Sequence, residues 1–272
     1  MPVDCDGYTK HCLASTSPTY AKNICSLPVL TLPLCLAHAI IAAEAGGIPR
    51  LKDFIVKNTR HHVTIAGNIG VGKSTLVEIL AEEFGWQPYY ELVADHPYLD
   101  DYYKDRERWG FHSQIWFLTQ RFDQHLEIED TPISVCQDRS IYEDYEVFVK
   151  GLLEQGIFSH RDFRTYRRLF QALTQRITPP TLLIYLQASL PTLLKRINGR
   201  DRPSERGIPA AYLTQLNQRY DEWLRHFEIC PVLTIETDQL DFAHDPAARR
   251  EIVDLVGQAV GVRGPIQERF TT

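Results

Sequence analysis

A phosphate-binding pattern, G-x-x-x-x-G-K-[ST], is formed by Gly67, Asn68, Ile69, Gly70, Val71, Gly72, Lys73, Ser74 and Thr75. The backbone N–H groups of such a loop can point at phosphate oxygens, and the following helix places its positive end there. We expect Lys73 to contact the β- and γ-phosphates of a nucleoside triphosphate and Ser74 to bind Mg²⁺. A β-branched run at 62–66 precedes the loop, and a helical pattern that ends at Gly85 follows it. This context favours a nucleotide site over an ordinary glycine-rich turn.

Three charged residues, Glu91, Asp138 and Arg139, accompany the ends of predicted strands. Ligands of doubly wound folds bind beyond the carboxyl ends of the strands, so these side chains are candidates for a site. Glu91 can take the proton from an attacking hydroxyl, although a glutamate at a strand end is often only a solvated loop residue. Asp138 can share Mg²⁺ with Ser74, and the alternative is that it caps the helix beginning near Ile141.

A helix is predicted at 109–122, and on it Gln114 and Arg121 lie seven residues apart. They therefore project from one face, two turns apart, with an aromatic and aliphatic surface between them. This arrangement suits a flat heterocycle, because the amide of Gln114 offers a donor and an acceptor to the edge of a base. The alternative is an exposed polar helix face.

A basic cluster, Arg196, Arg200 and Arg202, is followed by Glu205. Arg196 and Arg200 share a helix face, and the glycine and proline nearby loosen the chain. We interpret the segment as a mobile basic lid whose guanidinium groups neutralise charge during phosphoryl transfer and keep water out. The alternative is a solvated run of charges.

The elements that must position these residues alternate between apolar strand patterns and helical patterns from residue 62 onward. This alternation predicts an α/β fold with a parallel sheet covered on both faces. The five candidate strands are 62–66, 88–93, 132–137, 181–186 and 231–235. They form the core of a domain expected at 61–262, between an N-terminal extension, 1–60, that we expect to be poorly structured and a C-terminal tail, 263–272.

The composition of the 272-residue chain limits the classes of function. The net charge of -6 argues against nucleic acid as the main ligand. The six cysteines form no C-x-x-C pair, as is typical of reduced thiols in a cytoplasmic protein. The apolar run 27–43 has 17 residues, two prolines and a histidine, so we expect no membrane insertion. Neither a secretory signal nor a mitochondrial leader is expected.

Together the motifs resemble the deoxynucleoside kinase family over residues 62–245. The similar segments are 67–75, 91–93, 102–105, 114–122, 138–144 and 196–209. The resemblance implies a P-loop kinase that works as a homodimer in the cytoplasm. It also implies roles for residues of this chain: Glu91 as general base for the 5′-hydroxyl, Arg139 as support for the transferring phosphate, Tyr103 and Glu205 as ligands of the 3′-hydroxyl, Gln114 as partner of the base, and Asp241 and Phe242 in a loop around the adenine of the phosphate donor.

The resemblance also bears on substrate choice. We expect Arg121 and Asp144 to meet as an ion pair at the far wall of the base pocket, as in the branch that takes deoxycytidine and purine deoxynucleosides. Asp138 stands where many relatives have glutamate, as in purine-preferring members, while Leu92 replaces the usual proline. The extension 1–60 has no counterpart in the family's minimal domain.

The predicted activity is transfer of a phosphoryl group from ATP, with Mg²⁺, to the 5′-hydroxyl of a deoxynucleoside, in line and without a covalent enzyme intermediate. Deoxyadenosine or deoxyguanosine is the expected acceptor, in nucleotide salvage. The alternatives are deoxycytidine kinase specificity, a nucleoside monophosphate kinase of the thymidylate type, and a non-catalytic nucleotide-binding regulator. The acceptor side, formed by Glu91, Tyr103 and Gln114, suits an uncharged nucleoside better than a monophosphate.

Overall fold

The computed structural model describes residues 60–91, 95–200 and 207–262. Residues 1–59 of the predicted extension and the whole predicted tail, 263–272, lie outside the described residues. So do Leu92, Arg202 and Glu205. Among the residues that are described, no helix is long and apolar enough to cross a membrane.

A five-stranded parallel sheet with the order β2-β3-β1-β4-β5 forms the centre of the fold. Its strands are β1 (His62–Gly67), β2 (Gln87–Tyr89), β3 (Val135–Asp138), β4 (Leu182–Gln187) and β5 (Val232–Glu236). The strand that precedes the phosphate loop, β1, is in the middle. The predicted α/β class with five parallel strands is confirmed.

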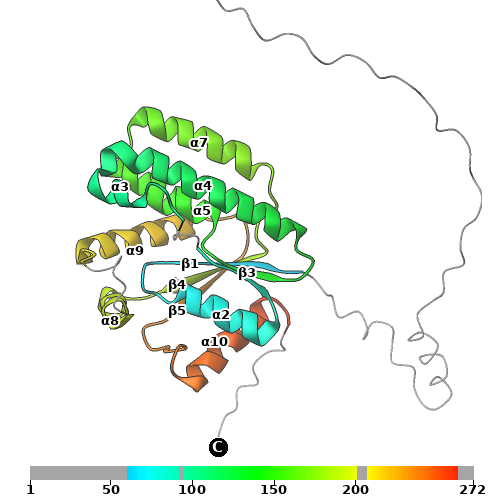
Figure 1. The fold of residues 1–272 in the computed structure, drawn as a ribbon. Coiled ribbons are helices and arrows are strands. Elements are labelled where there is room, and N and C mark those ends of the chain that lie inside the picture. Colours follow the sequence, from blue (N-terminus) through cyan, green and yellow to red (C-terminus); the bar gives the residue numbers. More distant parts are fainter. Residues whose placement is uncertain (1–59, 92–94, 201–206, 263–272) are drawn as a thin grey trace, which may run out of the picture. The chain divides into compact units, whose positions relative to one another are not determined.

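Helices cover both faces of this sheet (Figure 1). They are α2 (Lys73–Phe84), α3 (Leu99–Lys104), α4 (Arg106–Asp130), α5 (Ile141–Glu143), α6 (Lys150–Glu154), α7 (His160–Thr174), α8 (Leu190–Arg200), α9 (Ala210–Arg225) and α10 (Pro246–Ala259). In the view of Figure 1, α4, α5 and α7 lie above the sheet, and α2 and α10 lie below it.

The strands are apolar on both sides because helices bury both faces. In β4, Leu182, Ile184 and Leu186 join a core cluster with α2, α8 and α10. The alternate residues Leu183 and Tyr185 join a second cluster with α4, α5, α7 and α9. This division follows the two-residue period of a strand, whose successive side chains point to opposite faces.

Three strands, β1, β4 and β5, agree with the sequence predictions to within one residue, whereas β3 begins three residues later than the predicted strand 132–137 and the second strand is shorter than predicted. The strand predicted at 88–93 ends too late, since β2 ends at Tyr89 and neither Tyr90 nor Glu91 belongs to a strand, while residues 92 and 93 lie outside the described residues. At Tyr90 and Glu91 contacts with side chains replace the backbone hydrogen bonds of the sheet. The side-chain amide of Gln124 donates to the backbone oxygen of Tyr90 at 3.0 Å, and Glu91 turns toward two arginines. The chain thereby leaves the sheet at the edge where a ligand can enter.

The helix predicted at 109–122 is longer in the structure, where α4 runs from Arg106 to Asp130. Its start is explained by Asp105, whose carboxylate accepts a hydrogen bond from the Arg108 N–H at 3.1 Å. Such an N-cap satisfies a backbone donor that the helix itself leaves unpaired.

A π-helical stretch, η3 (Asp144–Val149), lies between α5 and α6. The residues that flank it keep right-handed helical backbone angles, so the chain continues as one helix through all three segments. Single π-turns inside helices occur often at functional sites. Here the stretch begins at Asp144, one of the predicted site residues.

Candidate active site

The phosphate loop joins β1 to α2, and its glycines are required by backbone geometry and by close contacts. Gly72 has φ 109°, and a Cβ there would lie 2.8 Å from the ring of Phe242. Gly67 has φ 147°, and a Cβ would lie 2.6 Å from the backbone oxygen of Leu186. Side chains are excluded at both positions, so the loop can present its backbone to a ligand.

Lys73, at the start of α2, is buried under this loop. Its ammonium group donates to the backbone oxygens of Gly67 at 2.9 Å and Asn68 at 3.1 Å. Burial, reinforced by the nearby charge of Arg139, lowers the pKa of Lys73 to about 8. In this structure Lys73 thus spans the loop, and its predicted contact with the β- and γ-phosphates stays a prediction.

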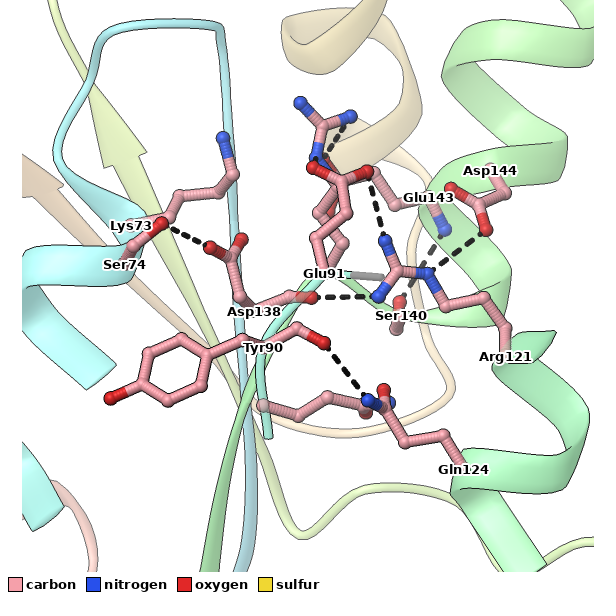
Figure 2. A network of polar contacts seen from close by, with 12 residues as sticks. Lys73, Ser74, Tyr90, Glu91, Arg121, Gln124, Asp138, Ser140, Glu143 and Asp144 are labelled. Carbon is pink, nitrogen blue, oxygen red and sulfur yellow. Dashed lines mark hydrogen bonds and ion pairs between the residues drawn. The ribbon is translucent and has the colours of Figure 1, made fainter. Parts of the chain in front are cut away.

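Ser74 and Asp138 meet at the mouth of the loop (Figure 2). The Ser74 hydroxyl donates to Asp138 Oδ2 at 2.6 Å. Oδ1 of Asp138 is buried and has no hydrogen-bond partner among the described residues. One carboxylate and one hydroxyl, completed by phosphate oxygens and water, form a typical protein environment for Mg²⁺. The residues present therefore fit the predicted metal.

The alternative role of Asp138, capping of the next helix, was wrong. Ser140 is the N-cap of α5, and its hydroxyl accepts a hydrogen bond from the Glu143 N–H at 3.4 Å. Serine is among the preferred capping residues, which leaves the carboxylate of Asp138 free to face the phosphate loop.

Glu91 lies between two guanidinium groups. Its Oε1 is 3.1 Å from Arg121 Nη2, and its Oε2 is 3.4 Å from Arg139 Nε. Burial acts to raise the pKa of Glu91, but the cations Arg139, Arg121 and Lys73 outweigh it, and the pKa lies below its usual range. The carboxyl group is therefore ionised at neutral pH and can accept a proton.

Arg121 connects Glu91 to the π-helical stretch. Its Nε donates to Asp144 Oδ2 at 3.2 Å, and its Nη1 donates to the backbone oxygen of Asp138 at 2.9 Å (Figure 2). The expected ion pair between Arg121 and Asp144 is present and buried. The contact of Arg121 with Glu91 was not predicted.

Arg139 is the only non-glycine residue with positive φ among the described residues, at 67°. This backbone conformation directs its guanidinium to a position between Glu91 and a second carboxylate, Glu143, whose Oε1 is 3.7 Å from Arg139 Nη1. The guanidinium also lies 4.6 Å from the ring centre of Phe148. Glu143 in turn accepts a hydrogen bond from the hydroxyl of Tyr220 on α9.

Sequence reasoning missed Glu143 and Tyr220 as site residues. Glu143 belongs to the quoted segment 138–144, and its acidic neighbour Asp144 was assigned a role while Glu143 was not. No signal along the sequence connects it with Tyr220, because the two residues are 77 positions apart.

Several members of this network line a cavity of about 370 Å³. It is lined by the phosphate-loop residues Ile69, Gly70, Gly72, Lys73, Ser74 and Thr75, and by Glu91, Tyr103, Gln114, Phe117, Asp138, Arg139, Asp144 and Arg200 among others. Tyr103, on α3, is 63% exposed, whereas Gln114, on α4, is only 7% exposed. Gln114 and Phe117, both on α4, add an amide and an aromatic ring to the lining of this cavity.

The structure separates the predicted basic lid into different parts. Arg200 lines the cavity at the end of α8. The inclusion of Arg196 in a mobile lid was wrong, because its guanidinium donates to the backbone oxygens of Val71 and Thr237 and to the Thr237 hydroxyl. Arg196 therefore fastens the phosphate loop to the segment after β5.

Neither of the two residues predicted to contact the donor adenine is among the residues that line this cavity. Phe242 is buried, with its ring next to Gly72. Asp241 is exposed and pairs with His244 at 3.0 Å.

Comparisons with known proteins show what the whole chain is similar to. The family model described as "Deoxynucleoside kinase" matches residues 63–261. A deoxyadenosine/deoxycytidine kinase of Bacillus subtilis is 38% identical over 200 residues, which are 73% of this chain and 92% of the relative. A deoxyadenosine kinase of Dictyostelium discoideum is 40% identical over 175 residues, 64% of this chain and 71% of the relative. A deoxyguanosine kinase of B. subtilis is 34% identical over 190 residues, which are 68% of this chain and 90% of the relative.

The fold is also similar to that of solved structures. The structure of deoxyadenosine kinase from M. mycoides with bound dATP superposes with a TM-score of 0.63 and 26% sequence identity. The match covers 74% of this chain and 99% of that protein.

Proposed function

The chain belongs to the deoxynucleoside kinase family, and on that premise we propose that it transfers the γ-phosphoryl group of ATP to the 5′-hydroxyl of a purine deoxynucleoside. The observation that carries this proposal is the position of Glu91. An ionised carboxylate lies in the same cavity as the phosphate loop, on the side where Gln114 and Phe117 can receive a base.

In the proposed reaction Glu91 accepts the proton of the 5′-hydroxyl as that oxygen attacks the γ-phosphorus. The bond between the γ-phosphorus and the bridging oxygen breaks, and ADP leaves. Such a transfer depends mainly on positioning and on cations that balance the charge of the phosphoryl group. Arg139, next to Glu91, and Lys73, under the loop, both line the cavity and supply two such cations.

Ser74 and Asp138 would hold Mg²⁺, supported by their contact and by the unpartnered Oδ1 of Asp138. The metal, when bound, neutralises charge on the phosphates. The described residues contain no cluster of three or more His, Cys, Asp or Glu residues that could hold a metal by themselves. A site built from one carboxylate, one hydroxyl and substrate phosphates is consistent with that finding.

The purine preference rests on Gln114 together with the buried pair formed by Arg121 and Asp144. A wall that offers hydrogen-bonding groups to a base edge rejects analogues that lack the matching groups. Two of the similar relatives are named deoxyadenosine kinase and deoxyguanosine kinase. We propose deoxyadenosine or deoxyguanosine as the best substrate, deoxycytidine as a weaker one and thymidine as a poor one.

The experiment is a panel of the four deoxynucleosides, with ATP and Mg²⁺, in which release of ADP is followed. Phosphorylation of a purine deoxynucleoside with the highest kcat/KM supports the proposal. A kcat/KM for thymidine at or above that of both purines would overturn the base preference alone. Phosphorylation of thymidylate but of no nucleoside would favour a monophosphate kinase, and ADP release independent of any acceptor would reject the proposed reaction.

The remaining expectations follow from the family and are proposals here. We propose that 61–262 is the catalytic domain, that the protein works in nucleotide salvage in the cytoplasm, and that it is a homodimer. Tyr103 and Glu205 are proposed to hold the 3′-hydroxyl, with Arg200 and Arg202 closing over the phosphates. Light scattering of the purified full chain tests the dimer directly.

A further inference from the structure

Glu143 is a completely buried carboxylate next to the proposed phosphoryl-transfer site, and none of the roles assigned above uses it. It is not among the residues that line the cavity described above. Its Oε1 accepts a hydrogen bond from Tyr220 and lies 3.7 Å from Arg139 Nη1. Its Oε2 is buried without a hydrogen-bond partner among the described residues. A buried charge of this kind is costly unless it is paired, so its presence calls for a reason.

Arg139 provides that reason, because its guanidinium is shared by two carboxylates. Glu91 is 28% exposed and reaches Arg139 from the cavity, whereas Glu143 is inaccessible and reaches it from the protein interior. When Glu91 turns toward an acceptor hydroxyl, it must give up part of its contact with Arg139. The buried Glu143 side chain cannot reach a substrate in the cavity, so it stays in contact with the Arg139 guanidinium.

We propose that Glu143 and Tyr220 are positioning residues that hold Arg139 in place while Glu91 engages the acceptor. The inference deepens the proposed function and rests on the roles given there to Glu91 and Arg139. Tyr220 contributes by fixing one oxygen of Glu143, which leaves the carboxylate a single orientation toward Arg139. Such support acts on turnover more than on ligand binding, because the geometry it preserves matters most in the transition state.

The charged groups around Glu143 come from several elements. Arg139 follows β3, Lys73 begins α2, Asp144 begins η3 and Tyr220 lies on α9. Burial raises the pKa of Glu143 to about 7, while Arg139, Lys73 and the hydrogen bond from Tyr220 act in the opposite direction. Protonation of Glu143 would remove the charge that faces Arg139. Loss of the Tyr220 hydroxyl should therefore move this protonation to higher pH.

A matched pair of variants tests the inference: Tyr220→Phe and Tyr166→Phe. Both tyrosines are fully buried in the same core cluster. The hydroxyl of Tyr220 binds Glu143, whereas that of Tyr166 has no hydrogen-bond partner among the described residues. The two substitutions remove the same atom from similar surroundings, so a general effect on packing should be common to both.

We expect Tyr220→Phe to lower kcat for the preferred deoxynucleoside by about tenfold, with KM for the nucleoside and for ATP changed by less than about twofold. The acidic limb of kcat/KM against pH, which reports the free enzyme, should move to higher pH. Tyr166→Phe should change neither. Glu143→Gln should lower kcat at least as much as Tyr220→Phe does. Because glutamine does not titrate, the part of the acidic limb of kcat/KM that Tyr220→Phe moves should be absent in Glu143→Gln.

A second measurement observes Arg139 without relying on turnover. The full chain with ¹⁵N-labelled arginine is followed by NMR, and the Nε–H signal of Arg139 is assigned by its loss in Arg139→Lys. Tyr220→Phe should shift this signal and speed its exchange with water, and Tyr166→Phe should not. An unchanged signal together with an unchanged pH profile would overturn the inference, as would equal effects of the two tyrosine variants. A wild-type chain inactive on all deoxynucleosides, with the NMR shift present, would instead reject the proposed function.

Discussion

Arg121 donates from Nη2 to Glu91 at 3.1 Å and from Nε to Asp144 at 3.2 Å, so a single guanidinium joins the proposed base pocket to the proposed catalytic carboxylate. The ion pair at the wall of the pocket is thus part of the same buried network as the general base (Figure 2). A substitution that disturbs the pair of Arg121 with Asp144 is therefore expected to change the position of Glu91 as well.

The first prediction concerns the stability of this network. Arg121→Met should lower the free energy of unfolding by about 3 kcal/mol or more, because it leaves Asp144 buried without its cation. The double variant Arg121→Met/Asp144→Leu should be more stable than the single one, as measured by urea unfolding. Arg249→Met, which removes an exposed pair with Glu82, is the control and should resemble wild type. A double variant less stable than Arg121→Met would show that the buried charge is not what destabilises it.

The second prediction concerns catalysis. Glu91→Gln should lower kcat by about 10² or more, since the amide cannot accept the proton of the 5′-hydroxyl. The Kd for ATP, measured by calorimetry, should change little because the lost charge faces the acceptor side. Glu107→Gln, an exposed glutamate in the first turn of α4, serves as the control. Near-full turnover of Glu91→Gln would mean that another group takes the proton.

The third prediction concerns stability in acid and depends on His62, which is buried in β1 beside His125. Burial, reinforced by the charge of His125, lowers the pKa of His62 to about 4, although the hydrogen bond with Gln137 opposes this. A lowered histidine pKa means that the stabilising effect is present above the unfolded value of 6.5 and is lost as the pH falls toward 4. Acid should therefore destabilise the fold in this window.

In urea unfolding at several pH values, His62→Gln should be less sensitive to acid than wild type. Removing this histidine reduces the slope of the free energy of unfolding against pH by up to about 1.4 kcal/mol per pH unit. His226→Gln, at an exposed position after α9, should keep the wild-type slope. If His62→Gln has that slope as well, His62 does not govern the loss of stability.

The fourth prediction concerns the residues before the first strand. A chain that begins at residue 60 should keep the kcat and Tm of the full chain, because every candidate site residue follows it and the described core starts in β1. Activity assays and thermal melts of the two chains provide the comparison. Loss of soluble protein on truncation would show that residues 1–59 contribute to the fold.

Local patterns explain why much of the fold was predictable. The phosphate loop depends on glycines whose conformations no other residue adopts easily, so residues 67–75 carry their own signal. The apolar runs of β3 and β4 are likewise typical of strands buried on both faces. Strand β2 was harder because, among the described strands, it lies at the edge of the sheet and pairs with β3 alone, and next to its end the amide of Gln124 from α4 binds the backbone oxygen of Tyr90.

The rest of the site depends on contacts between distant parts of the chain. Arg196 was assigned to the lid from its neighbours in sequence, but its partners Val71 and Thr237 are 125 and 41 positions away. Glu143 and Tyr220 are likewise brought together only by the packing of α9 on the π-helical stretch. No spacing rule connects such pairs, since their geometry is created by tertiary packing.

The π-helical stretch η3 has a consequence for how the chain can change in length. A wider turn accommodates the equivalent of one inserted residue within an otherwise α-helical segment. Deleting a residue between 145 and 149 would restore ordinary helical turns, but it would rotate one end of the segment against the other by about 100°. Asp144 pairs with Arg121 at the start of the stretch, and Glu154 pairs with Arg219 beyond its end. A chain shortened in this way can keep one of these two ion pairs but not both. The extra residue of the π-helical stretch therefore allows the pair at the base pocket and the pair between α6 and α9 to form together.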